Sequence, residues 1–281
     1  MTLLLLSVPL LVVYLGAEWA GDRLLERIAI IFFINLILVL GLQVFMGNSG
    51  ILSFAHIGFM GVGAYVSALI SIPLQMKSMA LPDLYPLLQT LQLSPYLAIP
   101  IGGLVAGLLA ALVSYPLMRL SDAAAVITSF ALLVVLHTVM IHWSAVTNGP
   151  RTLFGVPSAT HLPLVAAAAW LCLLVALAFK RSRFGLLLRA VRDDEIAAAG
   201  MGLNASRLRW YGFVLSALLA GVAGGLWAHF ITSFSPNAFY LKETFVILGM
   251  LVIGGAATVS GAVVGTVAVT VLYESLRALE N

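Results

Sequence analysis

Charged residues are scarce in this sequence, and that scarcity indicates the class of protein. Asp, Glu, Lys and Arg together make up 9% of the 281 residues, whereas hydrophobic residues make up 62%. A soluble domain carries about 25% charged residues, so we expect an integral membrane protein. The single cysteine, Cys172, lies in an apolar run, which excludes a disulfide framework and a cysteine metal site.

Catalytic motifs are missing as well. The chain has three lysines, none of which follows a glycine: Lys77, Lys180 and Lys242. A GxxxxGK[ST] phosphate loop is therefore absent, and so are the HExxH and GxSxG motifs. We expect that the chain is not an enzyme and has no cofactor or metal of its own. If it moves a solute uphill, the energy must come from a partner.

No predicted span carries a charged residue in its interior. An ion-coupled carrier usually keeps such a residue at membrane depth as a relay. Besides the tyrosines and the cysteine, the titratable groups in or near the membrane are five histidines: His56, His137, His142, His161 and His229. An ion-coupled secondary carrier that uses these histidines is one alternative hypothesis, and a scaffold that transports nothing is another.

Long apolar runs predict the membrane helices. Residues 1–19 predict a retained first helix rather than a cleaved signal peptide, because no basic segment precedes the apolar stretch. Residues 28–76 contain no charge and would form a helix about 73 Å long at ~1.5 Å per residue. That is more than twice the ~30 Å hydrocarbon core. We therefore expect a break at 47–50 (GNSG), with spans near 28–46 and 51–72.

Further apolar runs predict the remaining helices, which are listed with their connections at the end of this paragraph. The last run would be about 45 Å long as one helix and is interrupted by Gly254, Gly255 and Gly261, so it predicts two helices or a half-helix and a span. The total is eight or nine transmembrane helices, some broken or re-entrant. The predicted spans are 96–118, 122–142 with Ser121 or Asp122 as its cap, 163–179, 210–230 and 244–273; the irregular connections are 73–95, with a short interfacial helix, and 143–162.

Basic residues predict the orientation. Seven of the fourteen Lys and Arg residues lie in 180–209, so the positive-inside rule places this loop in the cytoplasm. The segment 119–122 is then cytoplasmic, and both irregular connections are external. Because successive loops alternate between the two sides of the membrane, residues 18–27 are then outside. The basic residues Arg23 and Arg27 fit that side less well.

Glycine-rich breaks precede small-residue helices in both halves of the chain, at residues 47 and 254. Transporters often place broken helices at corresponding positions of two structural repeats, with the substrate route between them. The alternative is that the glycines only permit close helix packing. The sequence alone leaves both interpretations open.

The charged loop has the pattern of a docking element. Small and apolar residues recur at helical spacing after Phe184, which predicts a short helix, a turn at 200–202 and a second helix capped by Asn204 or Ser206. The residues expected to engage a partner are Arg192, Asp194, Glu195, Ala197, Ala198, Gly200 and Gly202. The alternative is an amphipathic loop that lies on anionic headgroups through its arginines.

Four stretches carry a more specific signal. They are GNSGILSFAHIGFMGVGAYVSAL (47–69), TNGPRTLFGVP (147–157), RSRFGLLLRAVRDDEIAAAGMGLNASRLR (181–209), and 213–265 with FVLSALLAGVAGGLWAHF and LVIGGAATVSGAVVG. Within the third, DDEIAAAGMGLN resembles the EAA loop of bacterial ABC-importer permeases. As an ordered set, the four stretches resemble the LivM-type permease family of branched-chain amino acid ABC transporters. Each motif alone is moderately specific, and the ordered set is highly specific.

The resemblance implies a single all-α permease domain over 1–281 in the bacterial inner membrane. It also implies a LivH-like sister permease, two ATPase subunits that bind ATP and magnesium, and a periplasmic binding protein that delivers Leu, Ile or Val. Residues 184–203 would be the coupling helix, and membrane lipid but no nucleic acid would be a partner. Gln43, Phe54, Ala199 and Gly200 depart from the usual family pattern, which leaves urea, short amides or other amino acids as alternative substrates.

Polar residues near the first predicted break are candidates for the translocation path: Asn35, Gln43, Asn48, Ser49, Ser53 and His56. A modestly polar lining is sufficient if a binding protein supplies most of the selectivity. The same amides and hydroxyls could instead satisfy backbone groups that the break leaves free. Both interpretations remain open at this point.

Overall fold

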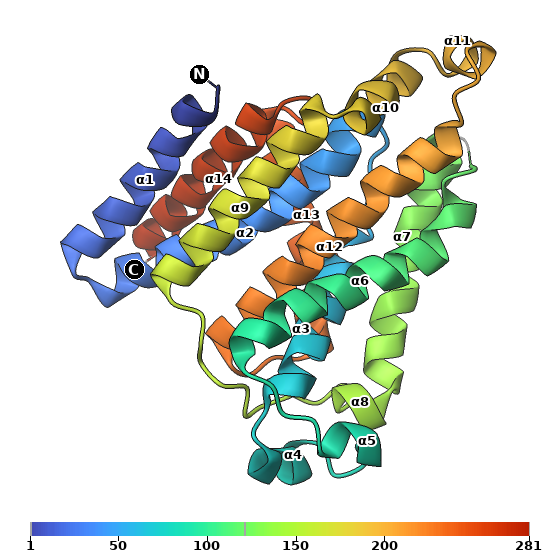
Figure 1. Ribbon diagram of the computed structural model, residues 1–281. Coiled ribbons are helices and arrows are strands. Elements are labelled where there is room, and N and C mark those ends of the chain that lie inside the picture. Colours follow the sequence, from blue (N-terminus) through green and yellow to red (C-terminus); the bar gives the residue numbers. More distant parts are fainter. Residues whose placement is uncertain (1, 121, 281) are drawn as a thin grey trace.

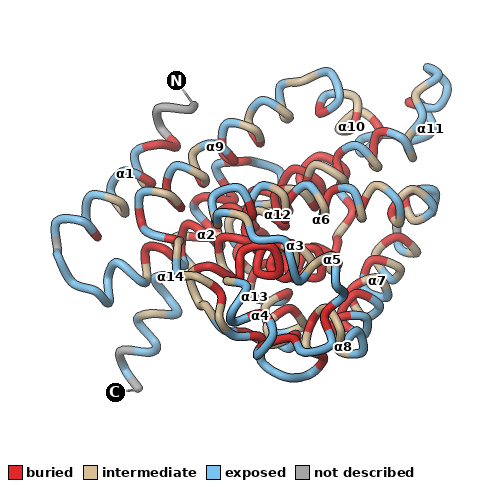
Figure 2. Tube along the Cα trace, turned by 60° about the horizontal axis from the view of Figure 1, so that its bottom comes forward, coloured by how far each residue is buried: buried red, intermediate tan, exposed pale blue. Residues whose placement is uncertain are grey.

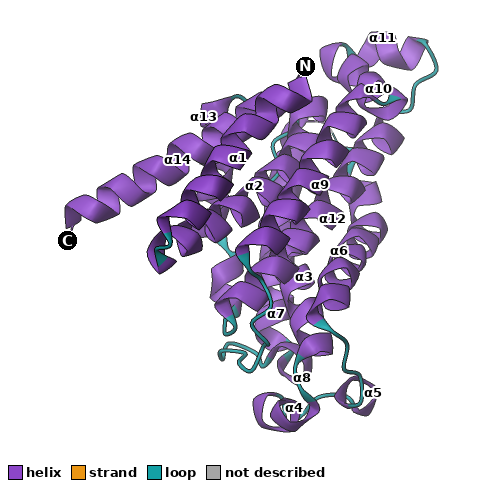
Figure 3. Ribbon diagram, turned by 60° about the vertical axis from the view of Figure 1, so that its left-hand side comes forward, coloured by secondary structure: helices purple, strands orange, loops and turns teal. Residues whose placement is uncertain are grey.

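The computed structural model describes residues 2–120 and 122–280, and regular structure in this part of the chain is helical (Figures 1 and 3). In order, the elements are α1 (Thr2–Ala20), α2 (Arg23–Ser49), α3 (His56–Ser71), α4 (Leu74–Ala80), α5 (Pro86–Gln89), α6 (Pro95–Leu117), α7 (Asp122–His142), α8 (Ser144–Thr147), α9 (Leu162–Arg181), α10 (Arg183–Asp193), α11 (Glu195–Gly200), α12 (Ala205–Ile231), the 3-10 helix η1 (Pro236–Phe239), α13 (Leu241–Gly254) and α14 (Val259–Glu280).

The helix lengths confirm an all-α integral membrane protein. Among the described residues, seven segments are long and apolar enough to cross a membrane: α2, α6, most of α7, α9, α12, η1 with α13, and most of α14. Two shorter apolar helices, within α1 and at α3, accompany them. Together they account for the expected eight or nine spans. The helix α7 begins at Asp122, and the alternative cap Ser121 lies outside the described residues.

The core of the bundle forms around α2, α3, α6 and α12 (Figure 2). Every residue of α2 from Phe32 to Ser49 is buried except Asn35, because other helices surround this one. Small residues bring the neighbouring backbones together, as membrane helices require when lipid is as apolar as their side chains. A Cβ on Gly224 of α12 would lie 1.9 Å from the Met60 carbonyl oxygen of α3. Close packing is therefore one role of the glycines.

Both predicted helix breaks are present. The first helix ends at Ser49, where Gly50 adopts a left-handed φ of 76° and donates its N–H to the Met46 carbonyl, as a C-terminal glycine does. Residues 50–55 are not regular, and α3 starts at His56 rather than near residue 51. The last apolar run forms two helices that separate after Gly254, with φ 95° at Gly255.

The loops gather at two ends of the bundle. Figure 1 shows α10 and α11 at one end with the beginning of α1, and α4, α5 and α8 at the opposite end. This arrangement agrees with the predicted sides, with 180–209 in the cytoplasm and 73–95 and 143–162 outside. At the external end, residues 153–160 are attached to the end of α12 by an antiparallel bridge between Leu153 and Phe234 and by a hydrogen bond from Thr160 to the Leu226 carbonyl, 2.8 Å long.

Candidate functional site

The charged loop forms a projecting pair of short helices, residues 183–204, which we name the coupling unit (Figure 1). Sequence spacing predicts one helix through Ala198, and that prediction is wrong in detail. Asp194 is extended, ends α10, and accepts a hydrogen bond from the Ala197 N–H as the N-cap of α11, 2.9 Å long. An aspartate gains more at an N-cap than in a helix interior.

The predicted turn after this pair is confirmed. The helix α11 ends at Gly200, and Gly202 has a φ of 79°. Asn204 then accepts a hydrogen bond from the Arg207 N–H, 3.0 Å long, so Asn204 rather than Ser206 caps α12. The chain therefore leaves the membrane at the end of α9 and re-enters it at α12 through two sharp corners with defined caps.

The coupling unit is attached to the bundle by a small apolar cluster. Leu188 and Val191 of α10 pack with Ala198 of α11 and Leu208 of α12, and none of the four is more than 8% exposed. Ala198 was expected at a partner surface, but its side chain is used in this cluster. The cluster packs the two short helices against the start of α12.

Glu195 is also held by its own chain. Its carboxylate forms a bidentate pair with Arg209 of α12, with N–O distances of 2.8 and 3.3 Å. Arg209 is 4% exposed, whereas Glu195 is 51% exposed. Paired, forked hydrogen bonds of this kind fix geometry as well as adding energy, so this pair ties α11 to the start of α12.

Arg192 points toward the bundle. It donates a hydrogen bond to the Gly47 carbonyl in the last turn of α2, 2.9 Å long, and lies 3.5 Å from the Asp193 carboxylate. Its stem covers Gly50, where a Cβ would lie 2.7 Å from Arg192 Cγ. The last carbonyls of a helix lack partners and attract cations. Arg192 therefore caps α2, and it does so from the coupling unit.

A second contact connects this region to the other helix break. Lys180, in the last turn of α9, donates a hydrogen bond to the Ala257 carbonyl in the turn between α13 and α14, 2.9 Å long. Arg189 of α10 in turn donates to the Lys180 carbonyl at 2.9 Å. Through these bonds the base of the coupling unit is joined to both interrupted helices.

The tip of the coupling unit exposes two large apolar side chains. Ile196 is 87% exposed and Met201 is 71% exposed. Ala197, Ala199, Gly200 and Gly202 are exposed between and beside them. The sequence predicted a contact made by small residues together with Arg192, Asp194 and Glu195, and it did not single out Ile196 and Met201. The signal for them was present, because they are large apolar residues in the most polar segment of the chain.

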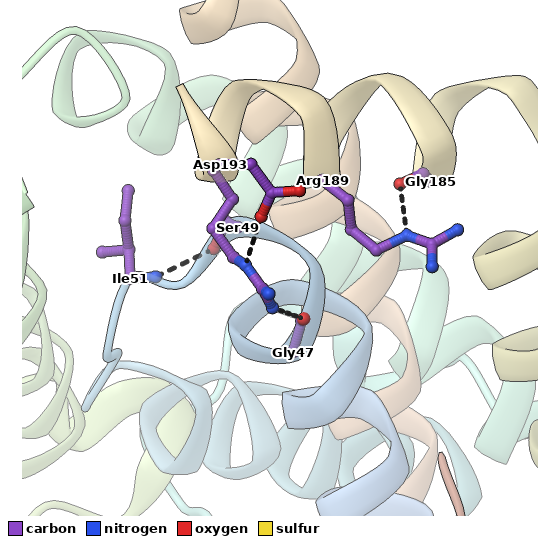
Figure 4. A network of polar contacts seen from close by, with 7 residues as sticks. Gly47, Ser49, Ile51, Gly185, Arg189 and Asp193 are labelled. Atoms are coloured by element: carbon purple, nitrogen blue, oxygen red, sulfur yellow. Dashed lines mark hydrogen bonds and ion pairs between the residues drawn. The ribbon is translucent and has the colours of Figure 1, made fainter. Parts of the chain in front are cut away.

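Five of the six path candidates are buried at or near the first break. Ser49 accepts a hydrogen bond from the Ile51 N–H at 3.2 Å (Figure 4), and the Asn48 amide donates to the Val44 carbonyl at 2.9 Å. Both therefore satisfy backbone groups near the break. His56 bonds the Ser216 hydroxyl of α12.

Unpaired polar atoms remain among these residues. Within the described chain, both amide atoms of Gln43 are buried without a hydrogen-bond partner, and so are Ser53 Oγ and His56 Nδ1. Buried polar groups are nearly always paired, and each exception requires an explanation. A water or solute in a transport intermediate would supply the missing partners, so these residues stay candidates for the path.

Asn35, the sixth candidate, lies apart from the others. It lines a pocket of about 150 Å³ between α2, α3, α12, η1 and α13. The one ionisable residue on that pocket is Glu243, near the start of α13. The structure thus places a carboxylate in a pocket among apolar spans, although the sequence suggested that no span has an interior charge. The sequence did not reveal this carboxylate, because Glu243 lies at the edge of the last apolar run.

Metal binding has no support in this geometry. Within residues 2–120 and 122–280, no three His, Cys, Asp or Glu side chains lie close enough together to hold an ion. The arrangement consists of an exposed apolar tip, an internal linkage to two helix breaks, and buried polar groups near the first break.

Comparison with known proteins identifies relatives over nearly the whole chain. Residues 24–281 match the family model described as "Branched-chain amino acid transport system / permease component". The high-affinity branched-chain amino acid transport system permease protein LivM of Escherichia coli K12 is 26% identical over 307 residues, which covers 97% of this chain and 68% of the relative.

Two further relatives differ in their names and coverage. A probable branched-chain amino acid transport permease protein LivH of Methanocaldococcus jannaschii is 26% identical over 87% of this chain and 78% of its own length. A nucleoside ABC transporter permease protein, NupC of Lactococcus lactis, is 33% identical over 32% of this chain and 27% of its own. No solved structure matches the chain.

Proposed function

The chain belongs to the family of permease components of branched-chain amino acid transport systems, and we propose that it carries Leu, Ile or Val through the bacterial inner membrane as one subunit of an ATP-driven importer. It is a translocation subunit and not an enzyme. In this proposal the remaining subunits are a LivH-like sister permease, two ATPases that bind ATP and magnesium, and a periplasmic binding protein.

The observation that carries the proposal is the coupling unit with its apolar tip. The three charged residues that were predicted to face a partner make internal contacts, with Arg192 on α2, Glu195 on Arg209 and Asp194 as a cap. Ile196 and Met201 remain exposed on an element that projects from the bundle. Exposed large apolar side chains on a rigid projection are a surface for a protein partner. Since this chain has no phosphate loop, a cytoplasmic ATPase is the partner that transport requires.

The mechanism follows from the internal linkage. When the ATPases close on ATP, they displace the tip, and the apolar cluster with the Glu195–Arg209 pair makes the coupling unit move as one body. Arg192 and Lys180 then transmit the displacement to the Gly47 and Ala257 carbonyls, which lie at the two helix breaks. Interrupted helices are the elements from which transporters form the substrate site.

Likeness to relatives named LivM and LivH supports a pathway made from two similar halves. Both relatives align with most of this chain, as expected if sister permeases share one architecture. The relatives named for nucleosides align with 32% and 26% of it. The extent of these matches supports a branched-chain amino acid as the substrate.

The contact with the ATPase is tested by placing a charge on the tip. We expect Met201→Asp or Ile196→Asp to weaken ATPase association about 10–100-fold, because a buried side chain of this size contributes about 1.5–3 kcal/mol. Met79→Asp is the matched control, since Met79 is 75% exposed at the external end. Co-purification of the ATPases and stimulated ATP hydrolysis in proteoliposomes are the measurements. Normal values for both tip variants would refute the contact.

The substrate is tested in the same proteoliposomes with the binding protein and ATP. Uptake of labelled leucine that unlabelled isoleucine and valine suppress is the expected result. Uptake of urea, a short amide or a nucleoside in place of leucine would refute the substrate while leaving the importer class intact. Uptake by this chain alone under a proton or sodium gradient would refute ATP-driven import.

A further inference from the structure

We propose that the pocket between Asn35 and Glu243 is a transient binding site for the transported amino acid, in which the Glu243 carboxylate receives the ammonium group. The inference rests on the proposed function, and it adds a site within the permease itself. The two polar side chains come from α2 and α13, and the walls include Leu38, Met60 and Trp227.

The depth of Glu243 is the first step. It lies one helical turn after Tyr240, whose ring stacks on His137 of α7 with ring centroids 4.1 Å apart. His137 is five residues before the end of α7, which is about 7.5 Å along the helix at ~1.5 Å per residue. On the same pocket, Trp227 is four residues before the end of α12. The carboxylate is therefore in the external half of the membrane, below the ends of the helices around it.

The missing counter-ion is the second step. Within the described residues, Glu243 has no salt bridge or hydrogen bond, and the Asn35 side chain has no hydrogen bond. A charged group at membrane depth is costly without a partner, and such groups usually pair with each other or mark a substrate route. The adjoining Lys242 is exposed and forms no ion pair with Glu243. In this proposal, the cation is the ammonium group of the ligand.

The remaining surface selects the class of ligand. The pocket has a volume of about 150 Å³, well below the ~300–1,000 Å³ typical of drug-sized ligands, so a small solute fits it. Its other walls are apolar, including Ile57, Ile247 and Ala238, which suits a branched aliphatic side chain. The Asn35 amide can donate to a ligand carboxylate. Together these features match a small ammonium-bearing aliphatic solute, and an α-amino acid in particular.

Weak binding is also expected, because no arginine or lysine lines the pocket. The ligand carboxylate therefore has an amide donor rather than a cation, and a charge-assisted pair exists at one end of the ligand only. A transporter site must release its ligand on each cycle, so modest affinity is consistent with this role.

Direct binding is the test. The assembled permeases and ATPases, in nanodiscs and without the binding protein, are examined by saturation-transfer NMR with L-leucine. 3-Methylbutylamine keeps the ammonium group and 4-methylpentanoate keeps the carboxylate, so the pair separates the two contacts. We expect leucine and the amine to bind and the acid to bind at least about 5-fold more weakly. Glu243→Gln should weaken leucine and the amine about 10–100-fold, the range of a lost charge-assisted hydrogen bond.

Glu26→Gln is the matched control, because Glu26 is an exposed glutamate at the external end of α2. In proteoliposomes, Glu243→Gln should keep stimulated ATP hydrolysis while leucine transport falls. If the Glu243→Gln variant transports leucine at the wild-type rate, the pocket is not a binding site for the transported amino acid. The proposed function would be unaffected by that result. Loss of the sister permease from the purified variant would show an interface ion pair and would also overturn it. A wild-type complex that moves no amino acid would refute the proposed function itself.

Discussion

Removing the cap that Arg192 places on α2 is the most direct test of how motion reaches the interior. Arg192→Met keeps an unbranched apolar stem over Gly50 and deletes the guanidinium that bonds the Gly47 carbonyl. A hydrogen bond to a charged group contributes about 1.5–3 kcal/mol, and a cation at a helix C-terminus adds about 0.3–1 kcal/mol. Since the arginine side chain is 35% exposed, water screens part of this energy, and we expect a loss of about 1–2 kcal/mol.

That loss has a local readout. A change of 1–2 kcal/mol alters an opening equilibrium about 5–30-fold, so amide hydrogens at residues 48–50 should exchange faster by that factor. Stimulated ATP hydrolysis should persist, because the tip is unchanged, while leucine transported per ATP should fall. The measurement combines hydrogen exchange by mass spectrometry with transport and hydrolysis in the same proteoliposomes.

Arg183→Met is the control for this prediction. Arg183 is exposed in the first turn of the same helix, α10, so the variant loses the same charge from the same loop without touching α2. If the two variants show the same amide hydrogen exchange at residues 48–50 and the same leucine transport per ATP, the cap does not transmit motion. The proposed mechanism would then be wrong.

Three further predictions concern the supports of this machinery. Gly224→Ala should prevent assembly, measured as loss of monodisperse protein, because the new Cβ would lie 1.9 Å from the Met60 backbone oxygen. Glu195→Gln should raise hydrogen exchange in α11 about 5–30-fold, because it leaves the nearly buried Arg209 without its carboxylate partner. Lys77→Met should make residues 86–94 protease-sensitive, because the buried ammonium holds two backbone carbonyls there.

The first two of these predictions have a control variant in the same chain. Gly249→Ala places a Cβ in open space on α13, so it should assemble normally if packing is the cause. Asp193→Asn removes an acid that is 71% exposed and should leave α11 unchanged. Equal damage from a control and its partner variant would contradict the corresponding argument.

The buried Lys77 should also make the stability of residues 86–94 depend on pH. Burial lowers the pKa of Lys77, so the folded state releases its proton more readily than the unfolded chain. Below the ordinary lysine pKa of about 10.4, the unfolded chain therefore binds more protons, and stability rises with pH. Protease resistance of residues 86–94 should increase from neutral pH toward that value and should lose this trend in Lys77→Met.

The sequence was sufficient for features that depend on local chemistry. A charge-free run longer than a membrane, with GNSG at its middle, required a break near residue 50, and Gly50 does adopt the left-handed conformation there. The cap at Asn204 and the turn at Gly202 were also local. The helix through Asp194 was predicted wrongly because an aspartate can lie within a helix or cap the start of one. In the structure Asp194 is the N-cap of α11.

Features that depend on distant neighbours could not be predicted. Arg192 was expected to face a partner, but its acceptor at Gly47 lies 145 positions away in sequence, and no local pattern reveals such a pair. Glu243 was missed because it lies at the edge of an apolar run, and its depth is visible only once Tyr240 is seen beside His137. The roles of Gln43 and Ser53 stay predictions, since burial alone does not distinguish a path from a core.

The two helix breaks meet at one place, beside the coupling unit. A Cβ on Gly47 would lie 2.3 Å from the Ala256 carbonyl oxygen, so only glycine lets the turn after α13 pack on the end of α2. Arg192 bonds Gly47 itself, and Lys180 bonds Ala257, the residue after that contact. In the proposed mechanism, a displacement of the coupling unit would therefore act on both breaks together. In that mechanism, α2 would carry the displacement to the unpaired Gln43 amide, one helical turn before Gly47, and α13 would carry it to the pocket at Glu243.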